Sequence, residues 1–110
     1  MRRSHTYSPQ TLDAARVLGL RIAEGRRQRR WTQGELSERA GISKATLRNA
    51  ERGEPTVAVG MMFELATLVG VELYGLPPGE LRNLAARESD RLALLPAHIY
   101  PRHVSVDDDF

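Results

Sequence analysis

Two short helical patterns lie in WTQGELSERAGISKATLRNAERG, residues 31–53, and this stretch decides the fold. Thr32 is placed to cap the first helix, and Glu35 three residues later completes a capping box that satisfies two otherwise unpaired backbone N–H groups. The pattern predicts a helix from about Gln33 to Ala40. Gly41 then supplies the left-handed residue that ends such a helix.

The second helix is predicted to run from about Lys44 to Arg52, with Ser43 as its N-cap and Gly53 at its end. Two helices joined by so short a turn must cross at a steep angle, which is the helix-turn-helix arrangement. Leu47 and Ala50 fall on the inward side of the second helix at about 100° per residue. The arc on its other side carries a cationic, hydrogen-bonding set: Lys44, Ala45, Arg48, Asn49 and Arg52.

This outward arc suits the major groove of B-DNA. A lysine or arginine there can donate to guanine, an asparagine can pair with adenine, and a small alanine can touch a thymine methyl group. Gln33 and Ser43 begin their helices, where phosphate contacts are made, and Ser43 can serve both as a cap and as a contact. A surface helix can carry arginines only as solvated groups, but the capped helix in front favours the DNA interpretation.

Length and composition set limits on the protein. The 110 residues suggest one domain, and the absence of cysteine removes disulfides and thiolate metal sites. No long apolar run follows the charged start Met1-Arg2-Arg3, so we expect a cytoplasmic protein without a signal peptide.

The net charge of +2 conceals a split between the two halves of the chain. Residues 1–53 hold 12 Lys/Arg against 5 Asp/Glu, a net charge of +7, and residues 54–110 hold 4 against 9, a net charge of −5. A basic half suits a polyanion such as nucleic acid. Charge alone leaves open that both halves are only solvated surface.

A first helix is predicted before the motif. Ser8-Pro9 has the pattern of an N-cap followed by proline at the first helical position, and helix-forming residues continue to about Arg30. Gly25 is a weak point, at which we expect the helix to bend or break. The face predicted to lie in the core consists of Leu12, Ala15, Leu18 and Ile22.

After the motif the sequence predicts a strongly apolar fourth helix through Met61 and Val69, ending at Gly70. Residues 71–74 are β-prone and could form an edge strand. The expected fold is all-α with five helices. We expect a flexible N-terminus over 1–8, a DNA-binding and dimerisation domain over 9–76, a C-terminal helix within 77–95 and an acidic, mobile tail over 96–110.

Residues spaced across the three predicted helices, within about residues 18–71, match the pattern of a known protein family. It comprises Leu18-Gly19, Arg21-Ile22, Arg26, Trp31-Thr32-Gln33, Glu35-Leu36, Ala40-Gly41-Ile42-Ser43, Leu47 and Glu51-Arg52-Gly53. In these the chain resembles the XRE family of lambda-repressor-like helix-turn-helix proteins. Gly25, where the family usually has a larger apolar residue, and Trp31, in place of a common leucine, depart from the pattern.

The resemblance implies roles for several residues. Arg26 would form a partly buried ion pair with Glu51 that ties the first helix to the third. Arg48 and Arg52 would lie on the side of the DNA backbone. The DNA-facing positions would be Gln33, Ser43, Lys44, Ala45 and Asn49.

Past the motif, Pro55-Thr56-Val57, Gly60 and the run from Leu65 to Val71 are similar to the HipB-type antitoxins within that family. This second resemblance implies a dimer whose strand, here Val71 to Leu76, pairs across the two-fold axis, and a HipA-like kinase toxin as partner. Phe110, at the end of the acidic tail, would dock into that partner. Acidic tails also occur simply as solubilising segments.

These patterns lead to a function hypothesis. We expect a homodimer that binds a pseudo-palindromic double-stranded DNA operator and represses transcription, as an antitoxin and autoregulator of a toxin-antitoxin operon. The alternatives are a stand-alone XRE-type regulator that responds to an unknown signal, and a mainly protein-binding toxin neutraliser. The dimer seam is expected to include Val69, Val71, Leu73 and Leu76.

An enzyme is not expected. The histidines His5, His98 and His103 are too scattered to suggest a metal site. No phosphate-binding glycine loop or nucleophile motif is present in the sequence. We therefore expect no catalytic residue, no metal and no cofactor.

Overall fold

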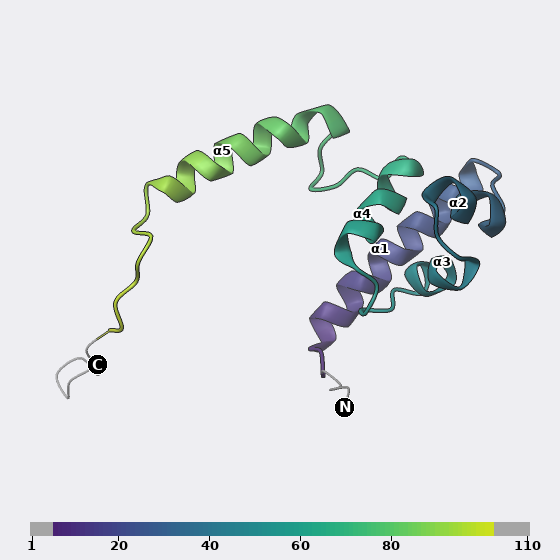
Figure 1. Ribbon diagram of the computed structural model, residues 1–110, viewed down its shortest axis with the longest axis horizontal. Coiled ribbons are helices and arrows are strands. Elements are labelled where there is room, and N and C mark those ends of the chain that lie inside the picture. The colour runs from purple at the N-terminus through teal and green to yellow at the C-terminus, as the bar shows by residue number, and fades with distance from the viewer. Residues whose placement is uncertain (1–5, 103–110) are drawn as a thin grey trace. The chain divides into compact units, whose positions relative to one another are not determined.

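Helices make up the regular structure of this protein, whose computed structural model describes residues 6–102 (Figure 1). The described chain divides into two units, one ending at Pro78 and the other beginning at Gly79. The first unit contains four α-helices, α1 (Pro9–Gln28), α2 (Gln33–Ala40), α3 (Lys44–Glu51) and α4 (Val59–Leu68). The all-α prediction is confirmed, since no strand is formed between residues 6 and 102.

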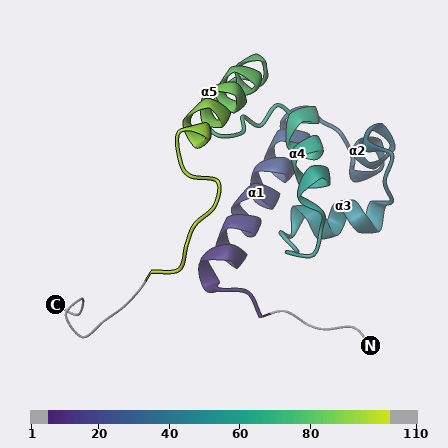
Figure 2. The ribbon, with the colours of Figure 1, turned by 60° about the vertical axis from the view of Figure 1, so that its left-hand side comes forward.

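The helices of the first unit pack in pairs. Helix α1 packs against α3 and α4, and α2 packs against the same two helices. Both views show α1 and α4 side by side, with α2 and α3 beside them (Figures 1 and 2). All four helices contribute to one core, which consists of Ile22, Leu36, Leu47, Ala50, Met62, Leu65, Ala66 and Val69.

The start of α1 lies outside this core, which corrects one expectation. Leu12 is 43% exposed and Ala15 is only partly buried, whereas Leu18 packs against the core and Ile22 is fully buried in it, as predicted. The end of α3 meets α1 at Ala15 and Arg16, where the backbone comes against Gly53. The turn that carries Leu12 precedes this contact and therefore lies at the edge of the core.

Gly25 does not bend or break α1, contrary to the prediction. The helix continues without interruption to Gln28. A β-carbon at Gly25 would lie 2.7 Å from the carbonyl oxygen of Val69, and Gly25 itself is buried. The glycine therefore allows the end of α4 to approach α1 closely, and this packing offsets its weak helix propensity.

The segment after α4 is a tight turn and not the expected strand over Val71–Leu76. Tyr74 and Gly75 both have positive φ, 56° and 69°, as the two central residues of a type I′ turn require. The N–H of Leu76 donates to the carbonyl of Leu73 at 3.2 Å, which closes the turn with one isolated antiparallel bridge. Two successive left-handed residues reverse the chain and so prevent a continuous strand.

A short 3₁₀ helix, η1 (Pro78–Glu80), begins at the last residue of the first unit, and the second unit contains α5 (Leu81–Ala93). No residue of α5 is buried. Several large apolar side chains of this unit are exposed, namely Leu92, Leu94, Leu95, Ile99 and Tyr100. Within the described residues, no helix has both the length and the apolar character needed to cross a membrane.

Candidate nucleic-acid interface

Side-chain caps fix where α2 and α3 begin, and both were predicted. The Thr32 hydroxyl accepts from the N–H of Glu35 at 3.0 Å, and the Glu35 carboxylate accepts from the N–H of Thr32 at 3.2 Å, so the capping box is complete. Gly41 ends α2 with φ 71°, in the left-handed region. The Ser43 hydroxyl then accepts from the N–H of Thr46 at 3.0 Å and caps α3. These bonds set the short turn that positions α3.

Helix α3 has one fully buried side and one exposed side. Leu47 and Ala50, the two side chains predicted to face inward, have no exposed surface. The residues expected on the outer arc are exposed or, for Asn49, partly buried. Its exposed members are Lys44, Ala45, Arg48 and Arg52, and the cap residue Ser43 is exposed as well.

Hydrogen bonding joins part of this arc. A guanidinium nitrogen of Arg52 donates to the side-chain oxygen of Asn49 at 2.5 Å. The same guanidinium lies 4.0 Å from the Glu54 carboxylate, in an exposed ion pair. The carbonyl side of the Asn49 amide is therefore engaged within the helix, while Lys44 and Arg48 have no ion-pair partner among residues 6–102.

A buried polar network lies where α1, α2 and α3 meet. Arg26 and Glu51 are 8% and 9% exposed, and their side chains form two hydrogen bonds, of 2.7 Å and 3.1 Å. Arg26 also donates to the carbonyl of Trp31 at 2.9 Å, and the Gln33 amide donates to Glu51 at 3.1 Å. The resemblance implies this ion pair, and the structure contains it. Gln33 is thereby held partly buried at the start of α2 instead of projecting freely.

The residue at position 31 is accommodated at the edge of the core. Trp31 is partly buried and packs against the core cluster. The guanidinium carbon of Arg39 lies 4.2 Å from the centre of the Trp31 ring, and that of Arg29 lies 5.8 Å from it. Such cation–π contacts contribute roughly 0.5–1 kcal/mol each at exposed positions.

The expected dimer seam needs one correction. Val69 is only 2% exposed and belongs to the core of its own chain, so it has almost no surface left to bury against a second copy. Val71, Leu73 and Leu76 are partly buried and retain exposed surface.

Sequence reasoning missed a surface hollow between α1 and α3. Four arginines line it: one comes from α3, one is the C-cap residue that follows α3, and two come from α1. Leu20, Ala23, Gln33 and Glu51 complete the lining, and the arginines are Arg16, Arg27, Arg48 and Arg52. The four-, three- and four-residue spacing of Arg16, Leu20, Ala23 and Arg27 was the signal that could have found this wall of α1.

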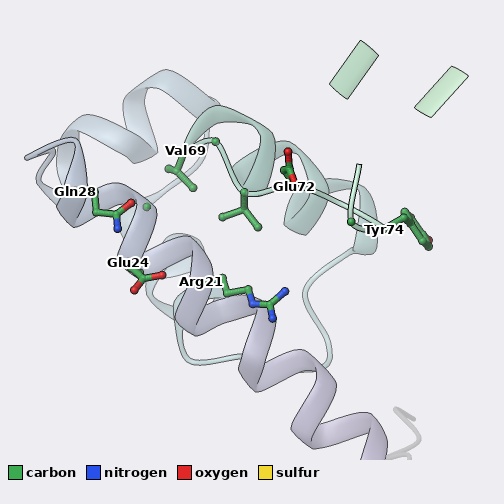
Figure 3. A pocket seen from close by; sticks show the side chains of 10 residues that line it. Arg21, Glu24, Gln28, Val69, Glu72 and Tyr74 are labelled. Atoms are coloured by element: carbon green, nitrogen blue, oxygen red, sulfur yellow. The ribbon is translucent and has the colours of Figure 1, made fainter. Parts of the chain in front are cut away.

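A second hollow lies beside α1, at the turn that follows α4. In Figure 3, Arg21, Glu24 and Gln28 come from α1, and Val69, Glu72 and Tyr74 come from the end of α4 and the turn after it. Its lining combines one arginine with two glutamates. This hollow therefore carries charges of both signs, unlike the arginine-lined one.

The remaining site expectations concern the C-terminal tail and metals. Phe110, the residue expected to dock into a partner, lies outside the described residues, as does His103. Between residues 6 and 102 no group of three or more histidine or acidic side chains gathers where it could hold a metal ion.

Comparison with known proteins agrees with this geometry. A family model described as Helix-turn-helix matches residues 22–76, half of the chain. The HTH-type transcriptional regulator SutR of Escherichia coli K12 is 37% identical over 88 residues, which cover 79% of this chain and 49% of SutR. The uncharacterized HTH-type transcriptional regulator y4dJ of Sinorhizobium fredii is 35% identical over 60 residues, which cover 54% of this chain and 78% of y4dJ.

The chain thus spans about half the length of SutR and most of y4dJ. No solved structure matches it. The matched residues 22–76 contain α2, α3, α4 and the buried Arg26–Glu51 pair. The chain therefore belongs to the XRE-type helix-turn-helix family of transcription regulators.

Proposed function

We propose that this protein is a sequence-selective DNA-binding repressor of transcription, with α3 as the helix that enters the major groove. The observation that carries the proposal is the division of α3 into a fully buried side and an outer side that bears the exposed Lys44 and Arg48 and the partly buried Asn49. A major groove about 12 Å wide admits an α-helix, and these side-chain types are the ones that recognise guanine and adenine edges.

The position of Lys44 supports a role beyond stability. It occupies the first position of α3, whose first turn has no acidic residue. A cation next to the positive end of the helix dipole is unfavourable by roughly 0.3–1 kcal/mol. A lysine there therefore costs the isolated domain stability, whereas it would be stabilised by an adjacent DNA base edge or phosphate.

A homodimer follows from the way such helices are used. Two copies related by a two-fold axis would place their α3 helices in successive major grooves, with half-sites roughly 34 Å apart on a pseudo-palindromic operator. Apolar surface for a seam is available on Val71, Leu73 and Leu76, which are partly buried in the single chain. Sedimentation over a range of concentrations tests this part, and a monomer at every concentration would contradict it.

DNA binding is tested by selecting bound sequences from a random duplex pool at moderate salt. We expect one enriched palindromic motif. Lys44→Ala and Asn49→Ala are expected to relax the base choice, with about 1–3 kcal/mol lost at the position each reads. The matched control is Arg87→Ala, which removes a cation from α5 and should leave the motif unchanged. No enrichment by the wild-type protein would refute the proposal.

The single lysine of the chain offers an independent test. Acylation of Lys44 by an amine-directed reagent, followed by mass spectrometry, measures whether this side chain is covered. Operator DNA is expected to slow the modification strongly, and the same duplex at high salt should not, because phosphate contacts weaken as salt rises. Equal modification rates with and without bound operator would place Lys44 outside the interface.

Protein binding by the C-terminal unit is a second candidate function. The run of exposed large apolar side chains that follows α5 favours it, among them Leu94 at 84% and Tyr100 at 79% exposure, because a larger exposed apolar patch often marks an interaction site. Under this hypothesis the protein is also the antitoxin of a HipA-like kinase and regulates its own operon. Co-purification with a kinase encoded beside it would support this role, and purified proteins that do not form a complex would exclude it.

A further inference from the structure

The arginine-lined hollow between α1 and α3 has a regular wall. At about 100° per residue, Arg16, Leu20, Ala23 and Arg27 fall within a stripe of roughly 60° on α1. This stripe faces Arg48 and Arg52 across the hollow, and Gln33 lies at its border. Arg16, Arg27, Arg48 and Arg52 are all exposed, so their guanidinium groups are available to a ligand.

Backbone packing places Arg16 close to the end of α3. A β-carbon on Gly53 would lie 2.5 Å from the α-carbon of Arg16, and one on Gly19 would lie 2.5 Å from the carbonyl oxygen of Ala50. With no side chain between them, α1 and the end of α3 touch through their backbones. Arg16 is therefore held beside the end of α3, next to its C-cap residue Arg52.

The cations of the hollow are poorly neutralised. Its one carboxylate, Glu51, already pairs with the buried Arg26. Arg52 has only the exposed 4.0 Å contact with Glu54. Within residues 6–102 no ion pair joins Arg16, Arg27 or Arg48 to a carboxylate. Like charges gathered without counter-charges create a positive potential that attracts an anion.

The hollow adjoins the side of α3 that is proposed to enter the major groove, because Arg48 belongs to both. We propose that the α1 wall of this hollow, through Arg16 and Arg27, binds phosphates of the DNA backbone beside the major groove that α3 enters. This inference rests on the proposed function. Arginine suits the role because its planar guanidinium can donate two hydrogen bonds to one phosphate.

The two α1 arginines are expected to contribute separately. Eleven residues of helix separate them, so their α-carbons lie about 16.5 Å apart along α1. Neighbouring phosphates of one strand are about 3.4 Å apart along the duplex axis, so each arginine meets a phosphate of its own. These contacts carry no base information, and they increase affinity for all duplex sequences alike.

The test is the salt dependence of DNA binding by the full chain, measured by fluorescence anisotropy on operator and non-operator duplexes. Removal of one phosphate-binding cation should reduce the slope of log K against log salt by about 0.9. Arg16→Ala together with Arg27→Ala is therefore expected to reduce the slope by about 1.8 and to weaken binding roughly 60-fold at 0.1 M salt. The base preference should not change.

Arg21→Ala is the matched control. Arg21 lies on the same helix, is exposed and faces about 140° away from Arg16, in the mixed-charge hollow of Figure 3. It should leave the slope unchanged. Replacing Arg16 and Arg27 with lysine keeps the two charges and should restore most of the slope. Circular dichroism verifies that each variant is folded.

The outcomes separate the two proposals. If the wild-type protein binds the selected operator and the double alanine variant has the same slope as Arg21→Ala, the hollow is not a phosphate site and the proposed function stands. If the wild-type protein binds no duplex DNA, the proposed function fails and the hollow proposal fails with it. A loss confined to the operator duplex would also overturn the inference, because it would indicate base recognition.

Discussion

Replacing Glu51 with alanine tests what holds α1 to α3. Arg26 is 8% exposed in the structure, and the change leaves its guanidinium with one hydrogen bond, to the carbonyl of Trp31. It also removes the acceptor of the Gln33 amide. A buried cation without its partner is the main cost of such a change.

The magnitude follows from the burial and the geometry of the pair. Breaking a buried, two-bond ion pair by removing one partner costs about 3–5 kcal/mol. Domains of this size are stable by roughly 5–15 kcal/mol, so the loss is a large fraction of the total. It corresponds to a fall in Tm of roughly 12–40 °C, at about 4–8 °C per kcal/mol.

Urea unfolding followed by tryptophan fluorescence measures the change in the free energy of unfolding. Trp31 is the only tryptophan, and its backbone carbonyl accepts directly from Arg26. Glu54→Ala is the control, since the Glu54 side chain is 48% exposed and its ion pair spans 4.0 Å. Exposed pairs of this kind contribute about 0–1 kcal/mol.

A double-mutant cycle with Arg26→Met isolates the interaction itself. If Arg26 and Glu51 stabilise the fold by pairing with each other, the double variant loses less stability than the two single variants lose in sum. A loss of less than about 1 kcal/mol in the free energy of unfolding for Glu51→Ala, equal to that of the control, would refute the reasoning. A buried guanidinium without its ion-pair partner should destabilise the fold by more than that.

The remaining predictions concern packing and capping. Gly25→Ala is expected to destabilise the domain by about 1–3 kcal/mol, because the new β-carbon would lie 2.7 Å from the Val69 carbonyl. Gly60→Ala in α4, with nothing within 4 Å, should be neutral or stabilising by up to about 1 kcal/mol. Thermal unfolding of both variants tests the contrast, and equal shifts would contradict it. Thr32→Ala removes the cap of α2 and is expected to cost roughly 0.5–2 kcal/mol in the same assay. No loss would show that the Glu35 N–H finds another acceptor.

The sequence predicted most where the signals were local. The caps at Thr32 and Ser43 and the inward positions of Leu47 and Ala50 depend on residues within one turn of each other, and these predictions are confirmed. The bounds of α2 were also predicted correctly, because a capping box and a left-handed glycine mark its two ends.

The errors arose where tertiary packing determines the local structure or the burial of a residue. Gly25 has a low helix propensity, yet the close approach of Val69 keeps α1 intact. Leu12 fits the periodic face of α1 but precedes Ala15 and Arg16, against which Gly53 packs, and is 43% exposed. At Tyr74 a non-glycine residue adopts φ 56°, which residue preferences argue against.

The arginine-lined hollow at the candidate site could not be predicted from the sequence for the same reason. Arg27 and Arg16 lie in sequence before the motif, and their spacing becomes informative only once the helix opposite them is known. The residues of α3 could be assigned from a helical wheel, because the capped pair of helices already specifies which side is buried.

The glycine-to-backbone contact between α1 and α3 has a consequence for how such proteins diversify. Gly19 and Gly53 let the backbones of α1 and the end of α3 touch, and the buried Arg26–Glu51 pair joins the same two helices, so the side chains of the outer surface of α3 take no part in these contacts. Under the proposed function, that surface can therefore be changed by point substitutions while the scaffold stays in place, which would make this chain a suitable host for new operator preferences.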